Sequence, residues 1–167
     1  HNSYLFKGTV EENLRMAEPD ATKEEMEAVL QKVNLLGFLQ TQNGLQTELL
    51  EKAGNLSGGQ CQRLVIARAL LRSDSAVYIF DEAASNIDVE SEELIMNVIH
   101  ELAKTKTVLL ISHRLANVVQ SDQIYFLKNG TICERGTHAE LMEQNGAYRH
   151  LYDSQMVLEN YGKEGNA

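Results

Sequence analysis

The sequence contains no Gly-x-x-x-x-Gly-Lys-Ser/Thr loop, the element that holds nucleotide phosphates in P-loop proteins. Its one Gly-Lys pair, Gly162-Lys163, has Val157 where the first glycine belongs and Glu164 where the hydroxyl residue belongs. The 167 residues therefore include no principal phosphate-binding loop.

Cysteines and long apolar runs are also scarce. The two cysteines, Cys61 and Cys133, fit no metal-binding spacing, and no apolar signal segment opens the sequence. We therefore expect free thiols in a reducing, cytosolic compartment. The longest apolar runs, such as residues 77–80 and 108–111, are far too short to span a bilayer. Any function at a membrane would require docking onto a partner segment.

Positive charge is in deficit, with 15 basic against 24 acidic residues and a net charge of −9. This balance argues against a surface that holds nucleic acid by neutralising its phosphates, so no nucleic-acid partner is expected. A hydrophobic content of 43% is enough for a packed core in one ordinary domain.

Helix signals recur through the first half of the chain. Thr9 can cap a short helix with acidic residues in its first turn, and an amphipathic helix follows Thr22. Gly37 is expected to end or interrupt that second helix. Ser57 is well placed as the N-cap of a third helix that continues to about Arg72. Later helices are expected at residues 89–103, 115–120, 138–144 and 147–156.

Two apolar runs, residues 76–80 and 108–111, are continuous rather than alternating. Such runs are typical of strands buried on both faces of a parallel sheet. With the helix at 89–103 between them, they predict a strand–helix–strand crossover and an α/β fold. Further on, Asn129-Gly130 predicts a hairpin between strands at 123–127 and 131–134.

Two adjacent acids, Asp81 and Glu82, directly follow the first of these strands. Open α/β sheets keep their ligands at the carboxyl ends of strands, and phosphoryl-transfer enzymes use one carboxylate for Mg²⁺ and another group to activate water. Asp81 would hold the metal and Glu82 would act on the water. The alternative is a strand-to-helix cap made of two acids.

His113 follows the second strand and is expected at the same sheet edge as the two acids. A neutral imidazole there could bond a γ-phosphate oxygen and the water-activating carboxylate. The alternative is an ordinary loop or capping histidine.

The Ser57-Gly58-Gly59 stretch combines a hydroxyl with bare backbone amides at the start of a helix. Such a helix start attracts anions, because its amides are unpaired and its dipole is positive. The alternative is a serine N-cap with flexible glycines that opens an ordinary helix.

Taken in order, these segments resemble the nucleotide-binding domain of ATP-binding cassette (ABC) transporters over nearly the whole chain to about Tyr152. The matching segments are residues 55–60 with Arg63, residues 77–82, residues 85–88 and His113. In that family they are the signature motif, Walker B with its catalytic glutamate, the D-loop and the switch histidine. Residues 5–14 and 136–141 look like exporter-type domains rather than importer cassettes or DNA-repair relatives.

The resemblance implies roles for individual residues. Asp81 would bind Mg²⁺, and Glu82 and His113 would be catalytic for ATP hydrolysis. Two domains would pair head to tail with ATP between them. The residues implied to bind ATP are Ser57, Gly58, Gly59, Gln60 and Asp88.

The resemblance also implies a fold and its division. The chain would be the C-terminal part of one domain, a partial P-loop NTPase (RecA-like) core with parallel strands plus the ABC α-helical subdomain. Walker A and the glutamine loop would lie upstream of His1, as would a fused transmembrane domain. The domain would lie on the cytoplasmic side of the membrane. The implied parts are residues 14–72 (mainly helical subdomain), 76–135 (core), 136–156 (C-terminal helices) and 157–167 (polar tail).

Three functions are weighed. The first is the ATPase motor of an exporter, which the intact Glu82 and His113 favour. The second is an interaction module that does not itself bind or hydrolyse nucleotide, which the missing phosphate loop favours. The third is a soluble, non-transport ABC ATPase, which the acidic charge and the exporter-like flanks disfavour.

Overall fold

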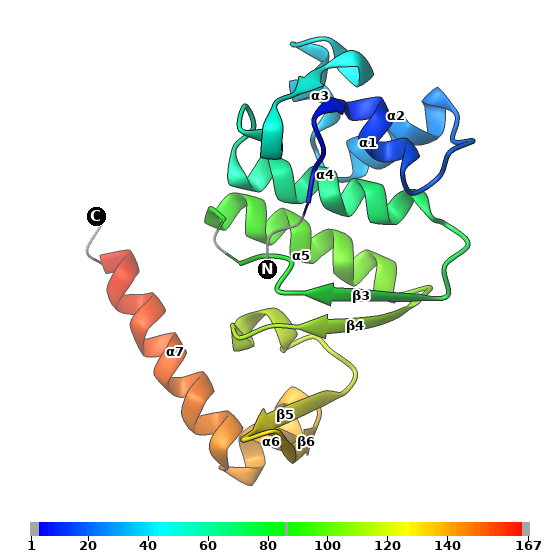
Figure 1. Ribbon diagram of the computed structural model, residues 1–167. Coiled ribbons are helices and arrows are strands. Elements are labelled where there is room, and N and C mark those ends of the chain that lie inside the picture. Colours follow the sequence, from blue (N-terminus) through cyan, green and yellow to red (C-terminus); the bar gives the residue numbers. More distant parts are fainter. Residues whose placement is uncertain (1–3, 86, 165–167) are drawn as a thin grey trace. The chain divides into compact units, whose positions relative to one another are not determined.

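The computed structural model describes residues 4–85 and 87–164, with side chains described as far as residue 158. The chain divides into two compact units, His1–Ile111 and Ser112–Ala167. Figure 1 shows the elements of each. Asn86 of the expected D-loop and residues 165–167 of the expected tail lie outside the described residues.

The predicted N-caps Thr9 and Ser57 are confirmed, and Thr22 caps the helix that was expected to follow it. Thr9 caps α1 (Val10–Arg15), Thr22 caps α2 (Lys23–Lys32) and Ser57 caps α4 (Gly58–Leu71). Each forms a capping box, in which the side chain three residues into the helix bonds back to the cap amide. Local sequence rules therefore decided where these helices begin.

The predicted end of α2 was wrong. The helix stops at Lys32, and Asn34 adopts a left-handed conformation with φ of 51°. Asparagine tolerates this conformation better than most residues, so it ends the helix here. Gly37 instead lies inside a separate short helix, α3 (Leu36–Gln40).

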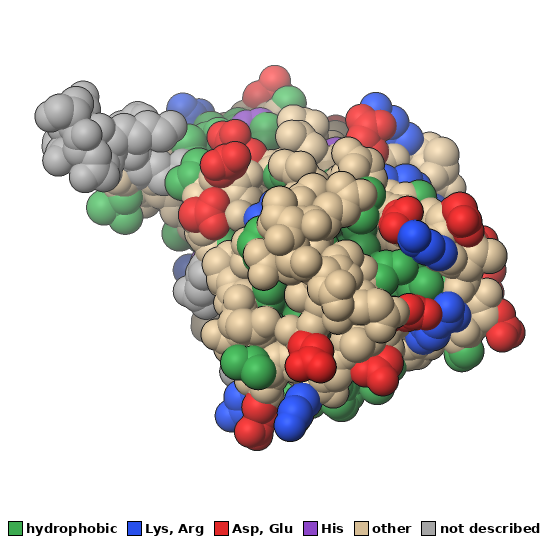
Figure 2. Space-filling model, turned by 90° about the horizontal axis from the view of Figure 1, so that it is seen from above, with side chains coloured by type: hydrophobic (Ala, Val, Ile, Leu, Met, Phe, Trp, Pro, Cys, Tyr) green, Lys and Arg blue, Asp and Glu red, His purple; other side chains and the backbone are tan. Residues whose placement is uncertain are grey.

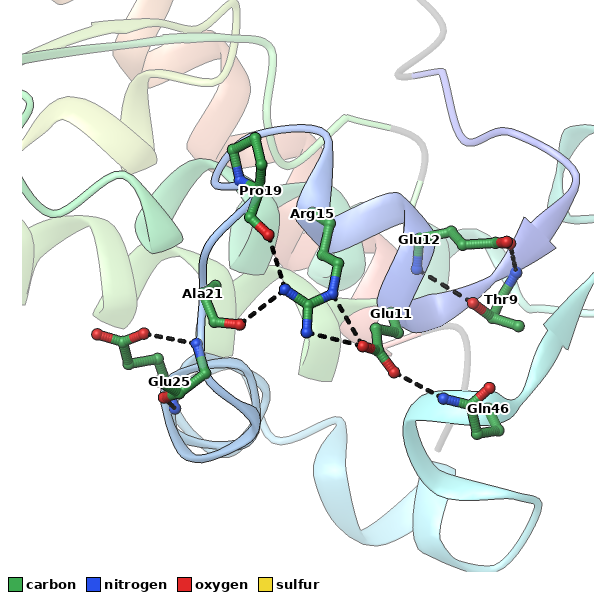
Figure 3. Close-up of polar contacts among 9 residues, drawn as sticks. Thr9, Glu11, Glu12, Arg15, Pro19, Ala21, Glu25 and Gln46 are labelled. Atoms are coloured by element: carbon green, nitrogen blue, oxygen red, sulfur yellow. Dashed lines mark hydrogen bonds and ion pairs between the residues drawn. The ribbon is translucent and has the colours of Figure 1, made fainter.

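Arg15 holds the turn between α1 and α2 together (Figure 3). Its Nη1 donates to the carbonyls of Pro19 at 2.7 Å and Ala21 at 2.9 Å, while its Nε donates to Glu11 at 2.8 Å. The other carboxylate oxygen of Glu11 accepts a bond from Gln46 at 2.6 Å. The turn is thus tied to the 3₁₀ helix η1 (Gly44–Gln46).

The predicted crossover is confirmed. Strands β3 (Val77–Asp81) and β4 (Thr107–Ile111) pair in parallel, with Asp81 opposite Ile111, and α5 (Val89–Ala103) connects them. Figure 1 shows α5 between α4 and the strand pair, in agreement with its contacts to both. The remaining elements of this unit are β1 (Gly8–Thr9), β2 (Glu48–Leu49), antiparallel to β1, and η2 (Glu51–Ala53).

The expectation that β3 is buried on both faces was wrong. Tyr78 and Phe80 are buried, whereas Val77 is 55% exposed and Ile79 is 65% exposed. Alternate residues of a strand point to opposite faces, and only one face of this strand joins the hydrophobic core. Among the described residues, nothing buries the other face.

The core of the first unit lies where α1, α2, α4 and α5 meet. Each fully buried apolar side chain there contributes roughly 1.5–3 kcal/mol by leaving water. The largest buried side chains of this core are Leu14, Met26, Leu30, Leu35, Leu39, Leu49, Leu64, Ile66, Ile95 and Ile99.

The second unit contains the predicted hairpin, formed by β5 (Ile124–Lys128) and β6 (Thr131–Gly136). Asn129 and Gly130 both have positive φ, 51° and 77°, as a tight hairpin turn of this kind requires. The helix expected at 115–120 is a four-residue 3₁₀ helix, η3 (Leu115–Val118).

Two C-terminal helices, α6 (His138–Gln144) and α7 (Ala147–Glu164), complete the second unit. The structure extends α7 through Glu164, where a polar tail was expected from residue 157. No proline interrupts this segment, so the helix can continue past residue 156.

Glu134 joins the hairpin to the start of α7. Its carboxylate accepts bonds from the amides of Ala147 at 2.5 Å and Tyr148 at 3.0 Å. A negative charge at this position satisfies free amides and the helix dipole together. Tyr148 is fully buried and its hydroxyl lies 2.9 Å from His138 Nδ1.

Candidate functional site

The start of α4 displays a hydroxyl and a glycine at the surface. Ser57 Oγ accepts a bond from the Gln60 amide at 3.2 Å, and Gln60 Oε1 accepts one from the Ser57 amide at 2.9 Å. The N-cap interpretation is therefore correct as local structure. It leaves the serine proton available for donation to a ligand, because the capping hydroxyl acts here as an acceptor.

Glu82 has an unusual backbone. Its φ is 51°, a left-handed conformation that is uncommon for residues other than glycine, asparagine and aspartate. The Glu82 amide donates to the Ile111 carbonyl at 2.9 Å, and its carbonyl accepts from the Ser85 amide at 3.0 Å. Such outliers cost about 1–3 kcal/mol and cluster at functional sites. The geometry turns the chain sharply, directly after the exposed Asp81.

Asp88 is the N-cap of α5. Its Oδ1 accepts a bond from the Ser91 amide at 2.9 Å. The Ser91 amide and hydroxyl, and to a smaller extent the Arg63 charge, hold the pKa of the Asp88 carboxyl below its usual value. Asp88 is therefore ionised at neutral pH, and one of its oxygens is used within the chain.

Arg63 connects the beginning of α4 to the end of α2. Its Nε donates to the Gly59 carbonyl at 3.3 Å, and its Nη1 donates to the Asn34 carbonyl at 3.0 Å. The left-handed Asn34 that ends α2 is therefore also held from α4. Sequence reasoning placed Arg63 in the motif but did not assign it this contact.

His113 is exposed and belongs to the second unit. Gln155 on α7 donates to the His113 carbonyl at 2.8 Å and accepts from the Leu115 amide at 2.9 Å. One side chain thus holds the backbone on both sides of Arg114. Sequence reasoning missed Gln155, because nothing local marks a glutamine 42 residues away as a partner.

The acids and the signature residues, Asp81, Glu82, Asp88 and residues 57–60, all lie in the first unit. Across the described part of the chain, His, Cys, Asp and Glu side chains form no group of three or more suited to a metal. Asp81 as a single carboxylate suits Mg²⁺, which usually takes one or two carboxylates and completes its shell with phosphate and water oxygens. Within residues 4–85 and 87–164, no helix has the length and apolarity needed to cross a bilayer.

A parallel strand pair ending in adjacent acids, with a Ser-Gly-Gly helix start in the same unit, defines a part of an α/β domain of the P-loop NTPase class. A sequence profile described as ABC transporter matches residues 1–85. The chain therefore belongs to the ABC transporter family, as the resemblance predicted.

Similar proteins agree with this membership. An uncharacterized ABC transporter ATP-binding protein of Haemophilus influenzae is 52% identical over all of this chain and 30% of its own length. The ATP-dependent lipid A-core flippase of Mannheimia succiniciproducens is 45% identical over 91% of this chain and 26% of its own.

A solved structure, that of a bacterial Atm1-family ABC exporter with ATP bound, matches with a TM-score of 0.84. It is 31% identical and covers 93% of this chain and 27% of its own. The predicted α/β fold, a RecA-like core with parallel strands and the ABC helical subdomain, is thereby confirmed. The chain spans less than a third of the length of the relatives it matches.

Proposed function

We propose that this chain is the C-terminal part of the ATP-hydrolysing motor domain of an exporter-type ABC transporter. The observation that carries the proposal is the left-handed Glu82 directly after Asp81, at the carboxyl end of a strand in a parallel pair. A strained acid at this point of an α/β sheet is a placement that catalysis explains and helix capping does not.

In this proposal, Asp81 holds Mg²⁺, directly or through its waters. The metal supplies neutralisation of phosphate charge. Glu82 orients the attacking water and accepts its proton, and His113 bonds the γ-phosphate and stabilises the orientation of that water.

The signature residues act across a head-to-tail dimer, on ATP bound mainly by a second nucleotide-binding domain. Ser57 offers its hydroxyl proton and Gly58 its exposed amide, at the positive end of the 14-residue α4. Gly59 adds a second amide, Gln60 holds Ser57 in place, and Asp88 follows in the D-loop.

The proposal also includes a transmembrane domain fused upstream of this chain. It places the chain on the cytoplasmic side of the membrane. Support comes from relatives named as export ATP-binding/permease proteins, such as one of Staphylococcus aureus that is 42% identical over 92% of this chain. No nucleic-acid partner is proposed. On the face shown in Figure 2, carboxylates are interspersed with the Lys and Arg side chains, so positive charge does not gather into one patch there.

The test is Glu82→Gln in the full-length protein. Loss of the positioned base should lower ATP turnover by about 10²- to 10⁴-fold while ATP binding persists and the closed dimer accumulates. Glu90→Gln, at an exposed acid of α5, is the matched control and should retain turnover. Undiminished turnover in Glu82→Gln would refute the assignment.

A second candidate concerns the 167 residues by themselves. The missing Gly-x-x-x-x-Gly-Lys-Ser/Thr loop favours an interaction module that neither binds ATP tightly nor hydrolyses it. Titration calorimetry with Mg-ATP tests this on the isolated chain, where micromolar affinity would contradict it.

A further inference from the structure

The two glycines that open α4 have different surroundings. Gly58 is exposed, whereas Gly59 is buried. A Cβ added to Gly59 would lie 2.9 Å from Ser91 Cβ and 3.0 Å from an Asp88 carboxylate oxygen, and closer still to the Ser91 hydroxyl. Such distances are shorter than van der Waals contact allows, so position 59 has no room for any side chain.

The neighbours of Gly59 cannot easily move away. Ser91 is only 6% exposed, and its amide donates to Asp88 at 2.9 Å as part of the cap that starts α5. The Ser91 hydroxyl also contributes to holding the pKa of the Asp88 carboxyl below its usual value. The atoms facing Gly59 therefore belong to a short, hydrogen-bonded helix start rather than to the end of a flexible side chain.

Arg63 lies one turn further along α4 and also contacts the turn that contains Gly59. Its Nε bonds the Gly59 carbonyl at 3.3 Å, and its charge acts on Asp88. The first turns of α4 and α5 are thus joined by the close approach of Gly59 to Ser91 and Asp88, near the positive charge of Arg63.

We propose that Ser91 is a positioning residue that, with Asp88, fixes the first turn of α4 on the first turn of α5. This contact is one reason why residue 59 is glycine. A close approach of a phosphate to the Gly59 amide would be a second reason. The contact sets where Ser57 and Gly58 are presented and couples them to the D-loop. Its consequence for ATP hydrolysis rests on the proposed function, whereas the packing itself does not.

The experiment is a rescue series in the full-length protein. Gly59→Ala should displace α4 and lower ATP turnover by about 10²-fold, the scale expected for a misplacement of about 1 Å. Adding Ser91→Gly removes the two nearest clashing atoms, the Ser91 hydroxyl and Cβ, and should restore most of the turnover. Adding Ser91→Ala leaves Cβ in place at 2.9 Å and should restore less.

Gly58→Ala is the matched control. Gly58 is exposed, so a loss of turnover there would come from the ligand side, and Ser91→Gly should not restore it.

ADP binding separates positioning from unfolding. Gly59→Ala should keep ADP affinity while kcat falls, because ADP is bound mainly by the phosphate loop of its own domain.

Three outcomes would overturn the inference: full turnover in Gly59→Ala, no rescue by Ser91→Gly, or equal rescue of Gly58→Ala. If the wild-type full-length protein hydrolyses no ATP, the proposed function fails instead. Thermal unfolding then tests the packing, with Gly59→Ala expected to lower Tm and Ser91→Gly to restore it.

Discussion

Ser57, at the start of α4, and Glu82, just after β3, are assigned to the same chemistry but have very different backbones. Ser57 lies in an extended conformation within a complete capping box, which is a relaxed arrangement that its own neighbours specify. Glu82 lies in a left-handed conformation and is held by the Ile111 carbonyl from the next strand. At Ser57 the same local structure therefore serves both stability and the proposed function. At Glu82 the backbone conformation that the proposed function uses lowers stability.

The largest expected effect separates function from stability at Glu82. Glu82→Gly should lower ATP turnover of the full-length protein by about 10²- to 10⁴-fold, because the base is lost. It should also raise Tm, since glycine removes a backbone strain of about 1–2 kcal/mol. ATPase assays and thermal unfolding measure the two effects.

Glu82→Gln is the control for that prediction, with the same loss of turnover but no gain in Tm. A drop in Tm for Glu82→Gly would show that the carboxylate stabilises the fold, and the contrast with Ser57 would then disappear.

A smaller effect is expected at Ser57, where the hydroxyl serves both the cap and the proposed ligand. Ser57→Ala should lower the free energy of unfolding by about 1 kcal/mol, and Ser57→Gly by only a few tenths, since glycine is itself a tolerated N-cap. Both should lower ATP turnover, because both remove the donor. Denaturant unfolding and ATPase assays on the two variants measure this. Equal stability of the two variants would contradict the capping role.

The smallest effect is a pH dependence at Asp88. The pKa of this carboxyl is lowered in the folded protein from an ordinary value of 3.8, chiefly by the Ser91 amide and hydroxyl. Its stabilisation is thus present above pH 3.8 and is lost as the pH falls through the lower folded pKa.

The stability difference between wild type and Asp88→Asn should therefore shrink at the acidic end of a pH series of thermal unfolding curves. Asparagine is also a good N-cap, so the difference at neutral pH should be small. A difference that grows below pH 4 would contradict the assigned direction of the shift, since the ordinary pKa is 3.8.

Prediction from the sequence succeeded where the relevant contacts are short-range. Thr9 and Ser57 each bond a residue three positions on, so their caps could be predicted. Thr22, after which a helix was expected, follows the same local rule. The Asn129-Gly130 turn follows from the same kind of local rule. The order of the motifs was enough for the family, because their joint spacing is specific.

Prediction failed where a distant partner decides the outcome. The exposure of Ile79 depends on what packs against each face of the sheet, and apolarity alone does not report it. The turn at Asn34, just after α2 ends at Lys32, is held by Arg63, 29 residues away. Gln155 holds His113 across 42 residues, and no local pattern indicates that pairing.

The sequence by itself determined the family, the α/β class, the starts of the capped helices and which residues are candidates for chemistry. These depend on residue type and on spacing within a few positions. Only the tertiary structure decided that Glu82 is left-handed, that Gly59 is buried against Ser91 while Gly58 is exposed, and that one face of β3 is open. The reason is that burial and backbone strain depend on atoms brought together from distant parts of the chain.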